Sequence, residues 1–270
     1  MTRSNGLQFP LEPLQLLAWA LLAIVVLGFY LFVVPSIEPH LAIGLGVLYA
    51  LLAITATGAG LASTAIDPVD KNVALQAKGL PPVVLSDEEG LQCYLCQIQV
   101  YLRSKHCRYC EKCVEEFDHH CRWLNNCIGK RNYRWFICLL CATFGMVLME
   151  ICLAIWLLVL YHQERAPHVT DRYDGLRELP FYFIIAILTP LVGLLAQLLG
   201  FHSMLGKGAM GEGLVLLYIL AYSSCRVAVY KNMTTYEYVI QQQREARERG
   251  PKPPCCKGAV AAKPLSVSLG

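Results

Sequence analysis

The chain alternates between long runs of apolar residues and shorter polar stretches, and this alternation predicts its main elements. Four runs contain almost no charged side chains, at residues 14–34, 41–62, 136–161 and 181–201. Because a helix rises about 1.5 Å per residue, each run is long enough to cross a hydrocarbon core of about 30 Å. The pattern therefore predicts an all-α integral membrane protein with four transmembrane helices.

Two residues inside these runs are unusual for a membrane span. Glu150 lies well inside the third run, where a carboxyl group exposed to lipid is costly. We expect Glu150 to face the bundle interior, a cavity or a partner, and a hydrogen-bonded structural role is slightly favoured over substrate binding. Pro190 in the fourth run lacks a backbone donor, which predicts a kink in that helix.

The polar stretches divide the rest of the chain. Residues 1–13 contain two prolines, and we expect a loose leader; the apolar run that follows is too long for the hydrophobic region of a cleaved signal peptide. A loop at 63–135 separates two pairs of spans, 14–62 and 136–201. The loop carries ten Lys and Arg residues, so the positive-inside rule predicts that it is cytosolic.

The C-terminal part is less regular. An apolar insertion at 202–230 is Gly-rich at first and then, from residue 214, apolar over a length that is marginal for a span. The tail at 231–270 carries seven Lys and Arg residues against three Glu, which favours the cytosol. We therefore interpret residues 214–230 as re-entrant, interfacial or packed on the bundle. Residues 235–249 can form a polar helix that ends before a Gly-Pro pair.

Composition supports a membrane protein and narrows the chemistry. Hydrophobic residues make up 56% of the chain and charged residues only 16%. The net charge of +3 is small and the basic residues are scattered, so nucleic acid is not an expected partner. The chain has 13 cysteines, and their close spacing with interleaved histidines favours zinc in a reducing compartment over disulfides.

Cysteine and histidine are concentrated at residues 93–127. This stretch offers ten candidate metal ligands, whereas two four-coordinate zinc sites use eight, so one Cys and one His are surplus. The count does not identify the surplus pair, although adjacent His119 and His120 point in different directions and are not expected to bind one metal together. The ten candidates are Cys93, Cys96, Cys107, Cys110, Cys113, Cys121, Cys127, His106, His119 and His120.

A surplus Cys and His could take part in a reaction. The neighbouring residues Asp118, His119 and Cys121 show one way in which this could occur. His119 can take the proton of the Cys121 thiol, whose ordinary pKa near 8.5 leaves little thiolate at neutral pH, and Asp118 can orient the imidazole. The other interpretation is that Asp118 supports a zinc-bound His120 and that Cys121 is simply buried. The residues by themselves favour the two interpretations about equally.

The run Asp-His-His-Cys at 118–121, within this cysteine pattern, resembles the signature of the DHHC protein S-acyltransferases, which are integral-membrane palmitoyltransferases. The likeness covers residues 93–127 and the four-span layout. Two shorter family motifs are also present, Asp-Pro at 67–68 and Thr-Thr-Tyr-Glu at 234–237. The resemblance implies a cytosolic zinc-binding cysteine-rich domain of short β-hairpins and loops between spans two and three.

The resemblance also implies roles for single residues. Cys121 would be the acylated nucleophile with His119 and Asp118 beside it, Thr235 would pack near Asp118, and Asn132 lies in another recurrent segment. The two structural zinc ions would be held by Cys93, Cys96, His106 and Cys113, and by Cys107, Cys110, His120 and Cys127.

The implied activity is transfer of a long-chain acyl group, most often palmitoyl, from acyl-CoA to a cysteine of a substrate protein. Acyl-CoA would be the co-substrate, and Arg122, Lys130 and Arg131 are candidates for binding its phosphates. The implied partners are the lipid bilayer and proteins with membrane-proximal cytosolic cysteines. The expected location is an endomembrane, Golgi or endoplasmic reticulum, with the site facing the cytosol. The alternative is a catalytically impaired, zinc-stabilised membrane adaptor.

The chain departs from the family pattern at three places. Val69 stands where the family has Gly after Asp-Pro, and Arg122 stands where Pro usually follows the catalytic Cys. Arg122 could favour a thiolate, meet a CoA phosphate or be solvated, and solvation is slightly favoured. The insertion at about 206–229 lengthens the connection to the Thr-Thr motif, so the sequence leaves open whether Thr235 reaches Asp118.

Overall fold

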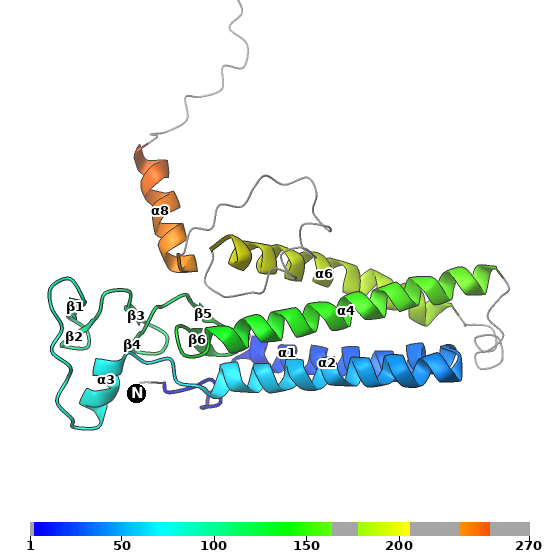
Figure 1. Ribbon diagram of the computed structural model, residues 1–270, viewed down its shortest axis with the longest axis horizontal. Helices are drawn as coiled ribbons and strands as arrows, with labels where there is room; N and C mark the ends of the chain where they lie inside the picture. Colours follow the sequence, from blue (N-terminus) through cyan, green and yellow to red (C-terminus); the bar gives the residue numbers. More distant parts are fainter. Residues whose placement is uncertain (1–2, 164–177, 206–232, 249–270) are drawn as a thin grey trace, which may run out of the picture.

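The computed structural model describes residues 3–163, 178–205 and 233–248. Within them, four helical segments lie side by side along the long axis of the molecule, and each is long and apolar enough to cross a membrane (Figure 1). The four predicted runs are therefore confirmed as helices. The segments are α1 (Pro13–Gly28), which continues as the π-helix η1 (Phe29–Val33) and the 3₁₀-helix η2 (Val34–Ser36), then α2 (Pro39–Ala65), α4 (Tyr133–His162) and α6 (Leu179–Leu205).

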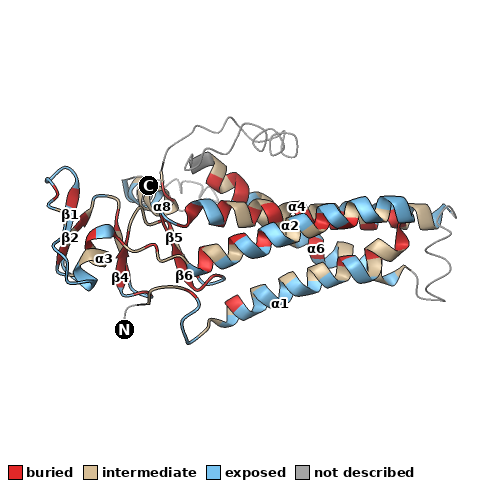
Figure 2. Cartoon of the chain, turned by 60° about the horizontal axis from the view of Figure 1, so that its bottom comes forward, coloured by how far each residue is buried: buried red, intermediate tan, exposed pale blue. Residues whose placement is uncertain are grey.

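The bundle is held by apolar packing around α4, which contacts both α2 and α6. Phe29 and Tyr49 stack with their ring centroids 3.7 Å apart, and Met146 and Phe181 complete the same buried cluster. The outer faces of the helices are largely exposed (Figure 2). They are also apolar, as at Ile43, which is 71% exposed. Apolar side chains on both inner and outer faces are typical of helices that are surrounded by lipid.

Glu150 faces the bundle interior, as predicted. Its side chain is buried, and Oε2 accepts a hydrogen bond of 2.8 Å from the hydroxyl of Tyr49. Because Tyr49 itself stacks on Phe29 within the main core cluster, the contact ties α2 to α4. This geometry agrees with the hydrogen-bonded structural role. Pro190 lies inside α6, which continues through it; the kink stays a prediction.

The cysteine-rich loop forms three antiparallel β-hairpins at one end of the bundle, as the resemblance implied (Figure 1). A short helix, α3 (Lys71–Ala77), precedes them and packs on β2. The strands pair in chain order, so each hairpin is a local unit. They are β1 (Gly90–Cys93) with β2 (Ile98–Tyr101), β3 (Lys105–Cys107) with β4 (Lys112–Val114), and β5 (His119–Cys121) with β6 (Asn126–Ile128).

The three hairpins share one turn geometry. Each has a loop of four residues whose last residue has a positive φ: 56° at Gln97, 52° at Glu111 and 52° at Asn125. A left-handed residue at the end of the loop is a common way to close a hairpin with the right strand twist. None of the three is glycine, so the surrounding contacts must hold this conformation.

The Asp-Pro motif makes its turn without the missing glycine. The backbone N–H of Val69 donates to Oδ1 of Asp67 at 3.1 Å, and Val69 also forms a bridge to Val114 of β4. Asp67 is further held by the ammonium of Lys112 at 2.5 Å. Val69 is not among the described residues that have a positive φ. The turn therefore does not require glycine at this position.

The expectation of a loose leader at 1–13 is wrong for residues 3–12, which pack against the cysteine-rich domain. The backbone N–H of Arg3 donates to the carbonyl of Cys110 at 3.1 Å, and that of Gly6 donates to Thr64 at 2.8 Å. A Cβ on Gly6 would lie 2.1 Å from the carbonyl oxygen of Leu124, so only glycine allows this approach. These polar backbone contacts have no hydrophobic periodicity and therefore left no trace in the sequence pattern.

The polar helix predicted at 235–249 is confirmed as α8 (Thr235–Glu248). Residues 214–230 lie outside the described residues, so their interpretation stays a prediction. Residues 164–177 and the end of the tail, 249–270, also lie outside the described residues.

Candidate active site and metal-binding clusters

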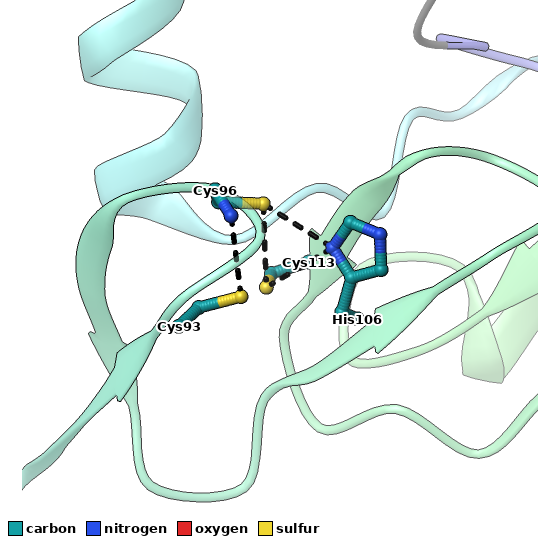
Figure 3. Close-up of side chains that lie close together, drawn as sticks. All are labelled: Cys93, Cys96, His106 and Cys113. Atoms are coloured by element: carbon teal, nitrogen blue, oxygen red, sulfur yellow. Dashed lines mark hydrogen bonds between the residues drawn. The ribbon is translucent and has the colours of Figure 1, made fainter.

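Two groups of four side chains could hold metal ions. In the first, Cys93 and Cys96 of one hairpin meet His106 and Cys113 of the next (Figure 3). The ligand atoms of each group all lie within 4.8 Å of one another. The second group is Cys107, Cys110, His120 and Cys127, and both groups coincide with the sets implied by the resemblance.

Distances within both groups fit a tetrahedral metal. Sγ of Cys96 lies 3.7 Å from Sγ of Cys113, and Sγ of Cys127 lies 3.5 Å from both Sγ of Cys110 and Nδ1 of His120. Zinc with Zn–S of about 2.3 Å and Zn–N of about 2.0–2.1 Å separates its ligand atoms by roughly 3.5–3.8 Å. Burial raises the pKa of the Cys113 thiol, so a thiolate there needs a nearby cation.

Strand alternation divides the ligands between the groups. Successive side chains of a strand point to opposite faces, so His106 joins the first group whereas the next residue, Cys107, joins the second. The same rule acts in β5, where His120 points toward the second group. His119 and Cys121 flank it and share the opposite face, which is why a metal ligand can lie between two residues that are not ligands.

A repeat of 14 residues underlies this arrangement. Cys93, Cys107 and Cys121 hold the same place in successive hairpins, and the same interval relates His106 to His120. Each metal group combines the Cys-x2-Cys of one hairpin with a His and a Cys of the following hairpin. The repeat is visible in the sequence, but the ligand count alone did not use it.

The repeat explains why Cys121 is left over. By position Cys121 corresponds to Cys93 and Cys107, but Leu124 occupies the place that Cys96 and Cys110 hold in the earlier hairpins. Leu124 is buried in an apolar cluster together with Cys121. The third hairpin therefore lacks the second thiol of a metal-binding pair, and neither metal group contains Cys121.

Asp118 and His119 form a hydrogen-bonded pair next to Cys121. Nδ1 of His119 lies 2.8 Å from Oδ2 of Asp118, whose side chain is fully buried. His119 also interacts with the thiol of Cys121, which is 9% exposed. The second oxygen of Asp118 accepts a bond of 2.8 Å from the backbone N–H of Thr235. Thr235 thus reaches Asp118 despite the insertion, which answers the question that the sequence left open.

These contacts shift two pKa values in directions that suit a thiolate. Burial disfavours the charged form of His119, but the hydrogen bonds to Asp118 and Cys121 outweigh it and raise the pKa to about 9. Burial also opposes the charge of Asp118, whereas the hydrogen bond and charge of His119, then the Thr235 N–H and the charge of His202, lower its pKa to about 2. At neutral pH, Asp118 is therefore a carboxylate and His119 an imidazolium facing Cys121.

The N-terminus of α8 is built to present its first N–H group to Asp118. Thr234 and Glu237 form a capping box, in which Oγ1 of Thr234 accepts from the Glu237 N–H at 3.0 Å and the Glu237 carboxylate accepts from the Thr234 N–H at 2.7 Å. Arg103 clamps that carboxylate with two bonds of 2.8 and 2.9 Å. The motif thereby fastens α8 to the cysteine-rich domain.

Two buried asparagines lock the third hairpin to the bundle. Asn126 of β6 donates to three carbonyls at the C-terminal end of α2, those of Ser63, Thr64 and Ile66, at 2.9–3.1 Å. Asn132, from the recurrent segment noted in the sequence, donates to the carbonyls of Ser63 and Cys127. Both orient the strand pair that carries Cys121.

Two of the three candidate phosphate-binding cations have acidic partners. Nε of Arg122 lies 2.6 Å from Oε1 of Glu12 in the N-terminal segment, and Nζ of Lys130 lies 2.6 Å from Oε1 of Glu115. Arg131 is exposed. The side chain of Arg122 is 58% exposed, so it is in contact with solvent as well as paired with Glu12.

Sequence inspection missed the aromatic wall on the far side of His119. Phe136 of α4 contacts the His119 ring, and His202 of α6 lies behind it with its ring centroid 6.3 Å from that of His119. A lone histidine at the end of an apolar run carries no recognisable signal, and only packing of α6 on α4 brings it here.

A bundle of helices long enough to cross a membrane, with two Cys₃His groups and an Asp-His-Cys unit at one end, indicates a multi-pass membrane protein with a candidate thiol site. A family model described as DHHC palmitoyltransferase matches residues 86–242, more than half of the chain. The chain belongs to this family.

The chain is similar in sequence to known palmitoyltransferases over most of its length. It is 30% identical over 267 residues to human palmitoyltransferase ZDHHC11, an alignment that covers 91% of this chain and 61% of the relative. It is 32% identical over 268 residues to human palmitoyltransferase ZDHHC1, covering 92% of this chain and 53% of the relative. A probable protein S-acyltransferase 20 of Arabidopsis thaliana is 36% identical over 155 residues, covering 57% of this chain and 20% of the relative. The chain thus spans about half to three fifths of the two human relatives.

Proposed function

We propose that the protein is an S-acyltransferase that moves a long-chain acyl group, most often palmitoyl, from acyl-CoA to cysteines of membrane-proximal proteins. The observation that carries the proposal is the thiol of Cys121, which belongs to neither metal group and lies beside the buried Asp118–His119 pair. The unit lies at the end of a bundle whose helices are long enough to cross a membrane, where an acyl chain could enter from lipid.

The reaction proceeds in two balanced steps. The Cys121 thiolate, whose proton is held by His119, attacks the carbonyl carbon of the acyl-CoA thioester; a carbon–sulfur bond to Cys121 forms and the bond to CoA breaks. The CoA thiolate leaves with a proton from His119. A substrate cysteine then gives its proton to His119, attacks the acyl-enzyme and releases Cys121. Both steps exchange one thioester for another, so positioning and thiolate supply matter most.

The two Cys₃His groups would each hold a zinc ion. Bound zinc would supply folding energy to the hairpins and take no part in the transfer. Held in this way, the second group orients β5 from one face, and His119 and Cys121 are free to act on the other.

The cysteine-rich domain is inferred to face the cytosol, on a Golgi or endoplasmic reticulum membrane. Its ten Lys and Arg residues support this side of the membrane. His202 near the end of α6 and Thr235 at the start of α8 both lie beside the Asp118–His119 pair. The described residues at the end of α6 and the start of α8 therefore lie at the end of the bundle that carries the hairpins.

Incubation of the purified protein with a clickable palmitoyl-CoA analogue tests the proposal. We expect a label that hydroxylamine removes, because thioesters are cleaved by it, and peptide mapping should place the label on Cys121. A folded protein with both zinc ions that takes up no label would reject acyl transfer and favour the zinc-stabilised adaptor. The intact contacts of Asp118 argue against that alternative.

Thr235→Pro is expected to lower the rate of acyl-enzyme formation about tenfold while leaving α8 folded. Proline is well tolerated at the first position of a helix, yet it removes the backbone N–H that donates to Oδ1 of Asp118. Losing a hydrogen bond to a buried charged group costs about 1.5–3 kcal/mol, and a factor of ten is about 1.4 kcal/mol. The measurement is the single-turnover rate of label uptake.

Thr235→Val is the matched control. Oγ1 of Thr235 is buried and has no hydrogen-bond partner among the described residues, so valine keeps the N–H and removes an oxygen that no described group satisfies. We expect its rate to stay near that of the wild type. Equal rates for the proline and valine variants would contradict a role for the N–H.

Glu12→Gln is expected to lower the KM for acyl-CoA about threefold, because an exposed ion pair contributes up to ~1 kcal/mol and its loss would release Arg122 for a CoA phosphate. Arg122→Gln should raise the KM instead. Steady-state kinetics with acyl-CoA as the varied substrate measures both. If neither substitution moves the KM, Arg122 does not contact CoA.

A further inference from the structure

His202 is a buried imidazole in the wall of the site that the two-step transfer does not use. It lies in the last turn of α6 and is 4% exposed. Its Nδ1 shares a hydrogen bond of 3.0 Å with the hydroxyl of Tyr133, the first residue of α4, which is also buried. The ring of His202 is therefore fixed in place by a partner on a different helix.

The fixed ring supports Phe136, which in turn contacts His119. Phe136 meets His202 edge to face, with centroids 5.3 Å apart and planes at 74°. It meets His119 in the same manner, at 5.3 Å and 67°. Edge-to-face aromatic pairs are favourable and directional, so the orientation of one ring constrains the next. Tyr133, His202 and Phe136 thus form a continuous support behind His119.

His119 requires support of this kind. It sits in a strand of three residues, and 30% of its side chain is exposed. The bond to Asp118 fixes Nδ1 but leaves the ring free to swing about that contact, which would carry its other nitrogen away from Cys121. Proton transfer falls off within a fraction of an ångström, so catalytic groups need packing as well as hydrogen bonds.

The same end of α6 also braces α8. Phe201, the neighbour of His202, packs edge to face on Tyr238 of α8 with centroids 5.5 Å apart. Because the first N–H of α8 holds Asp118, one turn of α6 supports both members of the Asp118–His119 pair.

We propose that His202, anchored by Tyr133, is a positioning residue that holds Phe136 against His119 and so keeps His119 directed at Cys121. This role rests on the proposed function, because it concerns the same thiol. It requires the shape of the ring of His202 rather than its acid–base chemistry.

His202→Ala tests the proposal in the full-length protein in lipid nanodiscs. The single-turnover rate of Cys121 acylation should fall about tenfold, with the KM for acyl-CoA changed less than about twofold, since positioning affects the chemical step and not substrate binding. Alkylation of Cys121 by iodoacetamide, followed by peptide mass spectrometry, should slow in proportion. Ser203→Ala is the control, because within the described part of the chain the Ser203 hydroxyl bonds inside α6, to the carbonyl of Leu199.

A double variant separates ring shape from imidazole chemistry. Tyr133→Phe with His202→Phe removes the hydroxyl and the imidazole of their shared hydrogen bond together and keeps an aromatic ring at each position. We expect it to acylate within about threefold of the wild type, well above His202→Ala. A double variant as slow as His202→Ala would show that the imidazole itself is needed and would overturn the proposal.

The other possible outcomes also test the positioning role of His202. Unchanged alkylation of Cys121 in His202→Ala would overturn the proposal, whatever the acylation rate. If wild-type protein forms no acyl-enzyme but His202→Ala still slows alkylation, the proposed function fails and the positioning role stands. If His202→Ala loses zinc or aggregates, Tyr133→Phe replaces it: it keeps the ring of His202 but releases its anchor, and an unchanged alkylation rate would overturn the proposal.

Discussion

Cys121→Ser is expected to remove the hydroxylamine-sensitive acyl label by more than about a thousandfold, the scale of loss seen when a covalent nucleophile is removed. The serine hydroxyl has a far higher pKa than a thiol, so His119 cannot hold its proton at neutral pH. The substitution should leave the metal groups intact, because Cys121 belongs to neither of them. The measurement is label uptake from a clickable palmitoyl-CoA analogue, with zinc content determined on the same sample.

Cys138→Ser is the matched control. Cys138 lies in α4, close in sequence to Phe136, and is half-buried like several other cysteines, but it belongs to neither metal group. We expect full labelling of this variant. A hydroxylamine-sensitive label that survives Cys121→Ser, or one that disappears with Cys138→Ser, would contradict Cys121 as the acylated residue.

Cys127→Ser is expected to reduce the zinc content from about two ions per chain to about one and to abolish labelling. Structural zinc contributes about 10–16 kcal/mol to the folding of small zinc domains. A site that loses one thiolate ligand therefore binds zinc weakly, and the hairpin loses most of this stabilisation. Cys127 pairs directly with His120 across the β5–β6 hairpin, which also carries His119 and Cys121. Metal analysis and label uptake on the same preparation test the prediction.

Cys93→Ser makes the comparison specific. It should also remove about one zinc, but from the first group, whose hairpin β1–β2 does not carry the active-site residues. We expect this variant to keep a measurable part of the activity, at least about a tenth, since β5 and β6 remain held by the second group and by Asn126. Complete inactivity of Cys93→Ser with the second zinc retained would show that the hairpins do not act as separate units.

The sequence supported the helices and the ligand set because both depend on local pattern. Apolar runs of this length form membrane-length helices whatever they pack against. Helices α1 and α2 begin at Pro13 and Pro39, because proline is suited to the first turn of a helix. The two metal-ligand sets were implied by the family resemblance, which itself rests on the spacing of Cys and His within short hairpins. Even the surplus of Cys121 is encoded locally, in the 14-residue repeat that places Leu124 where a second thiol would be.

Contacts between distant segments could not be obtained in that way. The N-terminal segment was expected to be loose, yet it is bound through backbone groups that every residue possesses, such as the bond from Arg3 to Cys110. Arg122 was assigned to solvent, thiolate or CoA, and it pairs with Glu12, which lies 110 positions earlier. Neither contact has a hydrophobic period or a motif to mark it.

The sequence by itself determined the four membrane-length helices and, once the family signature was recognised, the two metal-ligand sets, and it led to the proposal that Cys121 is the reactive thiol. Only the tertiary structure decided that Thr235 reaches Asp118 across the insertion and that His202 stands behind His119. The physical reason is the distance along the chain over which each feature is set. Strand alternation and helix length depend on residues that are close in sequence. The orientation of the His119 imidazole depends on contacts from α4, α6 and α8, which are far apart in sequence.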